Sequence, residues 1–149
     1  SAEKPMPGCK RLSLGRLRYH ATASPELGAR FFPSGVTATA LAAAPSLTFN
    51  QKDRLQSSWI RQQLGQDVQG PLHWLPSSQG FVDACLMGMG WGMNPIQLIE
   101  DHLASGRLVE LLPGETLDTP LFWQINRLAA DRLSLLTKTI VAEAGRALL

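Results

Sequence analysis

The stretch PSSQGFVDACLMGMGWGMNPIQLIEDHLASGRLVEL, residues 76–111, alternates between helical and extended patterns. A pair of serines opens a segment with apolar residues at helical spacing, three glycines follow, and an Asn-Pro pair opens a second helical segment that ends at Gly106. The apolar run LVELLP, residues 108–113, then predicts a strand. Helices that alternate with strands in this way indicate an α/β domain.

Glycines occupy every second position in the middle of this stretch, which raises the question of a phosphate-binding loop. A dinucleotide-binding fingerprint places its glycines directly after a strand and at the start of a helix. Here the glycines follow the helical pattern of residues 79–87, and no lysine that would bind phosphate accompanies them. We therefore interpret Gly88 as the end of a helix, and Gly90 and Gly92 as part of a strand that packs closely against a neighbour.

The same alternation extends along the rest of the chain. Further strands are predicted over residues 16–23, 46–50, 71–76 and 120–125, with helical patterns between them and a long amphipathic helix at the end. This order predicts a mostly parallel sheet with helices on both faces. The polar residues 114–119 interrupt the pattern and predict a change of sheet or subdomain.

The composition limits the possible classes of function. The 149 residues are 44% hydrophobic and 17% charged, with a formal net charge of +2, which fits one soluble globular domain. No block of lysine and arginine provides an electrostatic footprint for nucleic acid. The apolar runs are too short to span a bilayer, and two cysteines without a C-x-x-C pair disfavour a disulfide framework or a zinc site. We therefore expect a reducing, cytoplasmic compartment and no membrane partner.

The reactive side chains show no catalytic constellation. His20, His73 and His102 lack metal-binding spacing, so we interpret them as packing or surface residues. Cys85 lies on a predicted apolar helix face, which favours a buried and inert thiol. Asp53 is explained by its place at the positive end of a helix, and no G-x-S-x-G motif occurs. We expect no enzyme activity, no metal and no cofactor.

Small polar residues precede four of the predicted helices. Each of them alone is explained by ordinary helix capping, but the first backbone N–H groups of a helix also suit a carboxylate or another anion. Helix starts of this kind meet at one edge of an α/β sheet, so together they predict a small-molecule cleft. The capping residues are Ser24, Asn50, Ser77 with Ser78, and Asn94.

Three segments of the chain resemble one known family. Residues 14–37, LGRLRYHATASPELGARFFPSGVT, the stretch of residues 76–111, and residues 120–127, PLFWQINR, are similar to the effector domain of LysR-type transcriptional regulators. They resemble in particular the ArgP/LysG branch, whose members control the export of basic amino acids and related genes. The resemblance implies a fold like that of the type II periplasmic binding proteins, in which the effector binds between two α/β subdomains.

The resemblance also implies how the chain is organised. Residues 1–15 would form a lead-in segment, residues 16–113 the effector-binding subdomain II, and residues 114–149 the returning strand and C-terminal helix of subdomain I. The N-terminal helix-turn-helix of the family is absent from this chain, whose first residues read like a domain cut from a longer protein. Operator DNA would be bound only through that missing N-terminal domain.

The effector contacts that the resemblance implies coincide with the predicted helix starts. Asn50 carries an amide where close relatives can carry an acidic residue, which weakens the case for a cationic effector side chain. The implied effector-binding residues are Ala23, Ser24, Asn50, Ser77, Ser78, Gln79 and Asn94.

Together, these inferences predict the effector-sensing and oligomerising domain of a LysR-type regulator. We expect an amino acid, lysine or arginine, as the effector and a homodimer or tetramer as the assembly. A solute-binding protein of a transport system has the same fold and stays open as the alternative, and an α/β enzyme is a third, weaker possibility. An export signal or a helix-turn-helix upstream of the chain would separate the first two.

Overall fold

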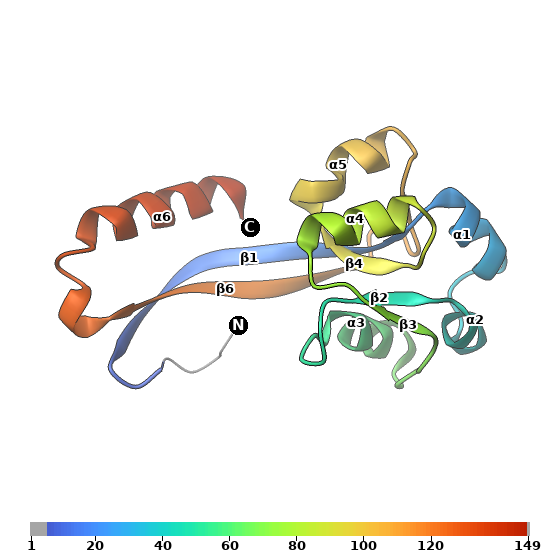
Figure 1. The fold of residues 1–149 in the computed structure, drawn as a ribbon, viewed down its shortest axis with the longest axis horizontal. Coiled ribbons are helices and arrows are strands. Elements are labelled where there is room, and N and C mark those ends of the chain that lie inside the picture. Colours follow the sequence, from blue (N-terminus) through green and yellow to red (C-terminus); the bar gives the residue numbers. More distant parts are fainter. Residues whose placement is uncertain (1–5, 149) are drawn as a thin grey trace. The chain divides into compact units, whose positions relative to one another are not determined.

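Strands and helices alternate along residues 6–148, the part of the chain that the computed structural model describes (Figure 1). The predicted α/β class is therefore confirmed. The elements in chain order are β1 (Cys9–Ala23), α1 (Pro25–Phe31), α2 (Ala38–Ala43), β2 (Ser46–Thr48), α3 (Leu55–Leu64), β3 (Leu72–Trp74), α4 (Ser78–Leu86), β4 (Gly92–Pro95), α5 (Ile96–Ala104), β5 (Val109–Glu110), β6 (Thr116–Asn126), the short 3₁₀ helix η1 (Arg127–Ala129) and α6 (Ser134–Ala147).

Contacts within the chain divide it into two compact units. Unit 1 contains residues 1–18 and 118–149, and unit 2 contains residues 19–117. The chain therefore passes between the units twice, after Arg18 and before Asp118. The second passage lies within the polar residues 114–119, at which the sequence predicts a change of sheet or subdomain.

The first strand differs from its prediction in length and in direction. β1 begins at Cys9 rather than at residue 16, so residues 9–15 of the predicted lead-in segment are extended. Within unit 2, β1 pairs antiparallel with β4 and β5, whereas β2 pairs parallel with β3 and forms a parallel bridge from Ser46 to Trp91. The expectation of a mostly parallel sheet is therefore wrong for β1. This strand enters unit 2 from unit 1, and the local alternation of strands and helices does not fix its direction.

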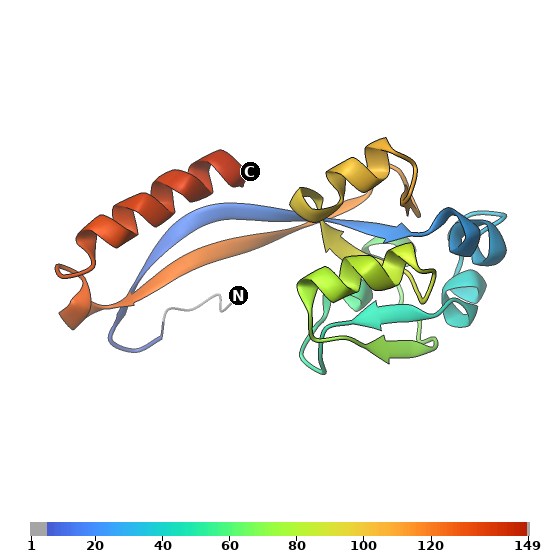
Figure 2. The same cartoon turned by 45° about the horizontal axis from the view of Figure 1, so that its top comes forward.

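Helices cover both faces of the strands in unit 2, as predicted (Figures 1 and 2). Side chains of a strand alternate between its faces. Trp91 and Met93 accordingly pack into one hydrophobic cluster with α1, α2 and α3. A second cluster joins α4 and α5 and contains Val82, Cys85 and Ile99. Each fully buried large side chain of these clusters contributes about 1.5–3 kcal/mol to folding, so the strands of unit 2 are held from both sides.

Three helix starts are capped by small polar side chains, two of which, Ser24 and Ser77, are caps that the sequence predicts. Ser24, Thr37 and Ser77 each accept a hydrogen bond from the backbone N–H three residues later, at 3.3, 3.1 and 3.1 Å. These bonds satisfy N–H groups that the helices α1, α2 and α4 leave without an internal partner. α3 ends at Gly65, which has the left-handed conformation with φ of 68°.

Gly88 and Gly92 have the structural roles that the sequence predicts, whereas Gly90 lies before β4 rather than within the strand. Gly88 follows the helix with φ of 72°, a conformation that other residues rarely adopt. A Cβ atom on Gly90 would lie 2.9 Å from the carbonyl oxygen of Pro45, and one on Gly92 would lie 2.4 Å from Cε1 of Phe81. Positions 90 and 92 therefore carry glycine because Leu47 of β2, Pro45 just before it and Phe81 of α4 leave no room for a side chain there.

Unit 1 is built from the outer parts of β1 and β6, which pair with each other, and from α6 (Figure 2). The indole Nε1 of Trp123 on β6 donates a hydrogen bond of 3.1 Å to the hydroxyl of Thr137 on α6. The guanidinium of Arg11 lies 4.1 Å from the ring centre of Phe122. Within residues 6–148, no helix combines the length and the apolar character that crossing a membrane requires.

Candidate functional site

A cavity of about 430 Å³ opens in unit 2 where the ends of β2 and β4 meet the starts of α3 and α4. The position agrees with the general rule that ligands of α/β sheets bind beyond the strand ends, near helix N-termini. Its walls combine aromatic, aliphatic, amide and charged side chains. The lining residues are Tyr19, Phe49, Asn50, Lys52, Asp53, Leu55, Ser78, Phe81, Met93, Asn94 and Pro95.

Asp53 provides a carboxylate that the surrounding backbone holds in place. Its Oδ2 accepts a hydrogen bond of 3.0 Å from the N–H of Phe49, and its Oδ1 accepts one of 3.0 Å from the N–H of Leu55. A carboxylate has about four acceptor positions, so both oxygens can accept further hydrogen bonds. Asp53 is therefore a fixed negative group in the wall of the cavity.

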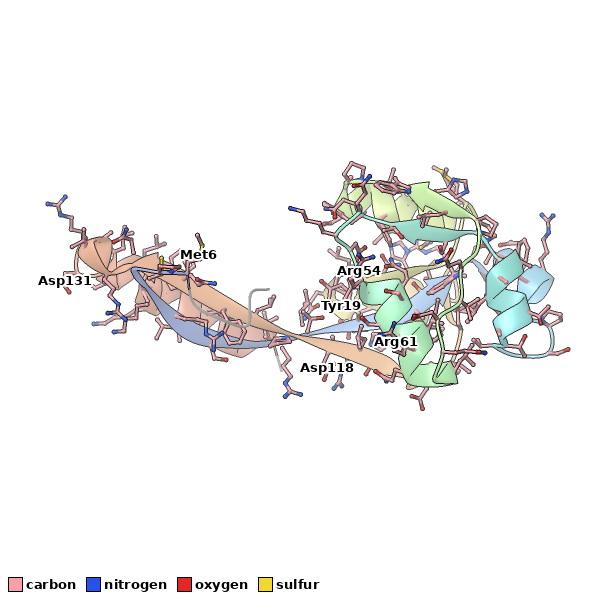
Figure 3. All side chains as sticks on the ribbon, turned by 90° about the horizontal axis from the view of Figure 1, so that it is seen from below. Met6, Tyr19, Arg54, Arg61, Asp118 and Asp131 are labelled. Atoms are coloured by element: carbon pink, nitrogen blue, oxygen red, sulfur yellow. The ribbon has the colours of Figure 1, made fainter. Side chains whose placement is uncertain are left out.

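Tyr19 lines the cavity together with this carboxylate. Burial of the half-buried phenol, and secondly the negative charge of Asp53, raise the pKa of Tyr19 above its ordinary value. The phenol is therefore neutral at physiological pH. Figure 3 shows Tyr19 next to the start of α3, where Arg54 precedes the helix. Aromatic surface beside a fixed anion is an arrangement that suits an organic cation.

The opposite charge is found at two places in the cavity wall. Ser78 is the first residue of α4, a helix of nine residues whose cap is Ser77. The N-terminal end of such a helix carries partial positive charge. The exposed Lys52 adds a full positive charge beside Asp53. The cavity thus offers one negative group, Asp53, and two positively charged places, Lys52 and the start of α4, so it can pair with one cationic group and with the carboxylate of a ligand.

The prediction that Asn94 caps a helix is wrong. β4 stays paired with β1 up to Pro95, and α5 starts only at Ile96 with no side-chain cap. Asn94 is 1% exposed, and its Nδ2 donates to the hydroxyl of Thr22 at 3.0 Å and to the sulfur of Cys85 at 3.3 Å. Continued strand pairing keeps the backbone extended, so this amide anchors the cavity floor to the interior of unit 2.

The prediction that Asn50 caps a helix is also wrong. α3 begins at Leu55, and the residue at its cap position, Arg54, makes no side-chain capping bond. Asn50 instead accepts a hydrogen bond of 2.8 Å from the N–H of Lys52 within the loop. The loop between β2 and α3 extends farther than the sequence indicates, because the carboxylate of Asp53 accepts hydrogen bonds from Phe49 at its start and from Leu55 at its end. Asn50 nevertheless lines the cavity.

Of the seven predicted site residues, the cavity brings together Asn50, Ser78 and Asn94. The other four lie outside its walls. Ala23 is completely buried, and the side chain of Ser24 is used to cap α1, beside a separate hollow at the end of α4. Ser77 caps α4, and the exposed Gln79 has its Nε2 3.5 Å from the carboxylate of Asp83.

Sequence reasoning missed Tyr19 and Asp53 as cavity residues. Asp53 is interpreted from sequence only as a charge near a helix start, and Tyr19 only as part of a strand pattern. One signal in the sequence could have indicated this carboxylate. Asn50 ends a predicted strand, and the acidic Asp53 follows it three positions later.

The chain is similar to a known protein family and to named relatives. The protein family described as the LysR substrate binding domain matches residues 2–145. The chain belongs to this family. It is 42% identical over 142 residues to the HTH-type transcriptional regulator ArgP of Pseudomonas aeruginosa, which covers 95% of the chain and 47% of that relative. It is 38% identical over 141 residues to LysG of Mycobacterium tuberculosis, with 95% and 46% covered. The LysR domain therefore spans about half the length of the curated relatives it matches.

Solved structures agree with this assignment. The C-terminal domains of a LysR family protein from Agrobacterium tumefaciens are 63% identical, with a TM-score of 0.96 and 99% of this chain and 72% of that chain covered. Full-length LysG from Corynebacterium glutamicum with bound effector Arg is 32% identical, with a TM-score of 0.83 and coverages of 99% and 50%. The resemblance to the ArgP/LysG branch and the type II periplasmic-binding-protein-like fold are confirmed.

The remaining reactive groups of this LysR domain have structural environments. The Cys85 thiol is buried, as predicted, and burial raises its pKa to about 12, against a smaller lowering by the hydrogen bond from Asn94, so the thiol is neutral. Nδ1 of His20 lies 2.7 Å from the carboxylate of Glu110, and His73 is exposed. Within the described residues, no group of three or more His, Cys, Asp or Glu side chains is placed to hold a metal ion.

Proposed function

We propose that the chain is the effector-sensing domain of a LysR-type transcriptional regulator and that its effector is a cationic amino acid, arginine or lysine. One observation carries this proposal: the carboxylate of Asp53, fixed by two backbone N–H groups, stands in a cavity with aromatic walls. The names of the relatives ArgP and LysG, and the arginine bound to one LysG structure, support the same class of effector.

The cavity can recognise the side-chain cation and the carboxylate of such a ligand. The cationic end would pair with Asp53 and lie against the ring of Tyr19 or Phe49, since a guanidinium or ammonium is attracted to an aromatic face. The carboxylate would lie near Lys52 and the start of α4. The amide of Asn50 therefore does not count against a cationic effector, because Asp53 supplies the negative charge three residues later.

Asn50, Ser78 and Asn94 remain in this proposal as effector-binding residues, because they line the cavity. Ser78 would contribute its hydroxyl and the first turn of α4, and Asn50 would contribute an amide at the end of β2. Ala23, Ser24, Ser77 and Gln79 would act through the backbone that they position. Residues 16–113 would correspond to the effector-binding subdomain, and residues 114–149, with β6 and α6, to the returning part of the other subdomain.

The whole protein would convert effector binding into a change at DNA. Effector binding shifts the population between conformations of the regulator, and the shift repositions DNA-binding segments in a homo-oligomer. The relatives are named HTH-type, so we assign operator binding to a helix-turn-helix outside this chain. We place the protein in the cytoplasm because a regulator must reach chromosomal DNA. The naming of these relatives supports regulation over solute transport and over catalysis.

Removal of the Asp53 charge tests the proposal. Asp53→Asn in the full-length gene product keeps one acceptor oxygen but loses the anion, so the affinity for L-arginine in calorimetry should fall about 10- to 100-fold, as expected when a hydrogen bond to a charged group is lost. Asp67→Asn is the matched control, because Asp67 is a carboxylate of unit 2 that pairs with Arg61 outside the cavity. It should bind L-arginine like the wild type.

Citrulline, a neutral analogue of arginine, sharpens the same experiment. The wild type should bind L-arginine more tightly than L-citrulline, and Asp53→Asn should remove most of this difference. Equal affinity of the wild type for the two ligands, or an Asp53→Asn variant with unchanged arginine affinity, would contradict the proposed recognition.

A further inference from the structure

Arg18 and Asp118 form a two-pronged ion pair at the residues where the chain leaves and re-enters unit 1. Nε of Arg18 lies 2.8 Å from Oδ1 of Asp118, and Nη2 lies 2.9 Å from Oδ2. Arg18 is on β1 and Asp118 is on β6, so the pair connects the two strands through which the chain passes between its units. Parallel hydrogen bonds of this kind fix the relative orientation of guanidinium and carboxylate.

The next residues on the two strands belong to unit 2. Tyr19 follows Arg18 directly and lines the cavity, while Leu117 precedes Asp118 and packs against the hydrophobic cluster that contains Trp59 and Trp91. Consecutive side chains of a strand point to opposite faces. Tyr19 in the cavity wall and Arg18 in the ion pair are therefore neighbours on β1, joined by one peptide unit, with side chains on opposite faces of the strand.

This arrangement has a mechanical consequence for β1. A ligand that contacts Tyr19 acts on the strand one residue away from Arg18, and the fixed geometry of the ion pair transfers a displacement of Arg18 to Asp118. The side chains are 40% and 22% exposed, so solvent weakens the attraction between the charges. The directional hydrogen bonds, rather than the strength of the charge pair, are what would couple the strands.

We propose that the Arg18–Asp118 pair is a positioning element of the effector response, which makes β6 follow β1 when a ligand occupies the cavity beside Tyr19. The inference rests on the proposed function of that cavity. Neither Arg18 nor Asp118 lines the cavity, so the pair acts on the response and not on the affinity for the effector.

Hydrogen–deuterium exchange with L-arginine in the full-length gene product tests the inference. In the wild type, arginine should change the exchange of amides in β6. Asp118→Asn keeps the size of the side chain but removes the charge, so it should lose most of this change. Its arginine dissociation constant in calorimetry should stay within about threefold of the wild-type value. The exchanged pair Arg18→Asp with Asp118→Arg should restore the change in β6.

The second pair of the same chemistry is the matched control. Arg61 and Asp67 also form several hydrogen bonds, of 3.1, 2.7 and 2.6 Å, but both residues lie within unit 2. Asp67→Asn should leave the response of β6 intact. Thermal unfolding of each variant identifies any that fails to fold, and the exchanged pair then decides the outcome, because a folded exchanged pair without a β6 response overturns the inference.

The results separate the two proposals. A wild type that does not bind L-arginine removes the proposed function and this inference with it. A wild type that binds L-arginine, together with an Asp118→Asn variant whose β6 response equals that of the wild type, overturns the inference alone. An Asp118→Asn variant that loses both its β6 response and its affinity for arginine also overturns the inference, because the pair would then support the cavity itself.

Discussion

Helices α4 and α6 are both amphipathic, yet the structure uses them differently. α4, in unit 2, buries four of its nine residues, whereas α6, in unit 1, has 14 residues and none of them is buried. Leu136, an apolar residue of α6, is 47% exposed. Amphipathic spacing therefore predicts which side of a helix is available for packing, but a core forms only where a second element meets that side.

The same contrast holds for the two units as a whole. Among the described residues, the buried hydrophobic side chains all belong to unit 2 except Ile125. Unit 2 also contains the candidate cavity, so the groups proposed to bind the effector stand on the better packed part of the chain. We therefore expect the free energy of unfolding to depend on the core of unit 2 far more than on the apolar residues of α6.

The largest expected effect comes from a core residue of unit 2. Trp59 is 0% exposed, so Trp59→Ala should lower the free energy of unfolding by about 3–5 kcal/mol through lost burial and a residual cavity. Leu135 of α6 is 77% exposed, and Leu135→Ala should change it by less than about 0.5 kcal/mol. Guanidinium unfolding followed by circular dichroism measures both values. Similar losses in the two variants would break the comparison between the units.

A smaller effect is expected from two glycines. Gly92→Ala would bring a Cβ within 2.4 Å of Phe81, so it should destabilise the chain by about 1–3 kcal/mol through overpacking. Gly145→Ala is the counterpart in α6, where the space around a Cβ is open, and it should stabilise the helix by about 0.5–1 kcal/mol. The two midpoints of denaturant unfolding should move in opposite directions. A Gly92→Ala variant as stable as the wild type would contradict this expectation and show that Phe81 and α4 can move to make room for the Cβ.

The smallest expected effect is a dependence of stability on alkaline pH through Cys85. Its pKa is raised from 9.0 to about 12 in the folded chain, so the unfolded chain loses the thiol proton first as the pH rises. The stabilisation is complete below pH 9.0 and is lost as the pH approaches 12. Between pH 8 and pH 10, the wild type should lose about 1 kcal/mol more unfolding free energy than Cys85→Ala.

Cys9→Ala provides the control for this titration, because Cys9 lies in unit 1 and is only half-buried. It should retain the pH dependence of the wild type. If Cys85→Ala and the wild type lose stability in parallel up to pH 10, the thiol is not protected from solvent as its burial indicates.

The sequence predicts the features that a few neighbouring residues determine. Ser24 and Ser77 cap their helices through bonds to residues three positions later, and Gly65 and Gly88 end helices through their own backbone conformation. Such contacts compete only with water, so the local pattern is sufficient to find them. The alternation of helices and strands, and with it the fold class, follows from the same local signals.

Features that depend on distant residues are not predictable in this way. Asn94 resembles a helix cap, but its backbone pairs with His20 in β1 and its side chain bonds to Thr22, 72 positions earlier. The direction of β1 depends on partners in β4 and β5. Asp53 joins the cavity wall because the loop folds back on both of its oxygens, and no periodicity of the sequence indicates that closure.

The close approach of Gly92 to Phe81 also limits how the cavity could change in evolution. Phe81 lines the cavity and at the same time fills the space that a side chain at position 92 would need. A larger residue at position 81 would collide with β4, and a smaller one would leave a void in the interior of unit 2. Adaptation to a ligand of another size would therefore proceed through the exposed residues Phe49 and Asn50, which can vary without disturbing the packing behind them.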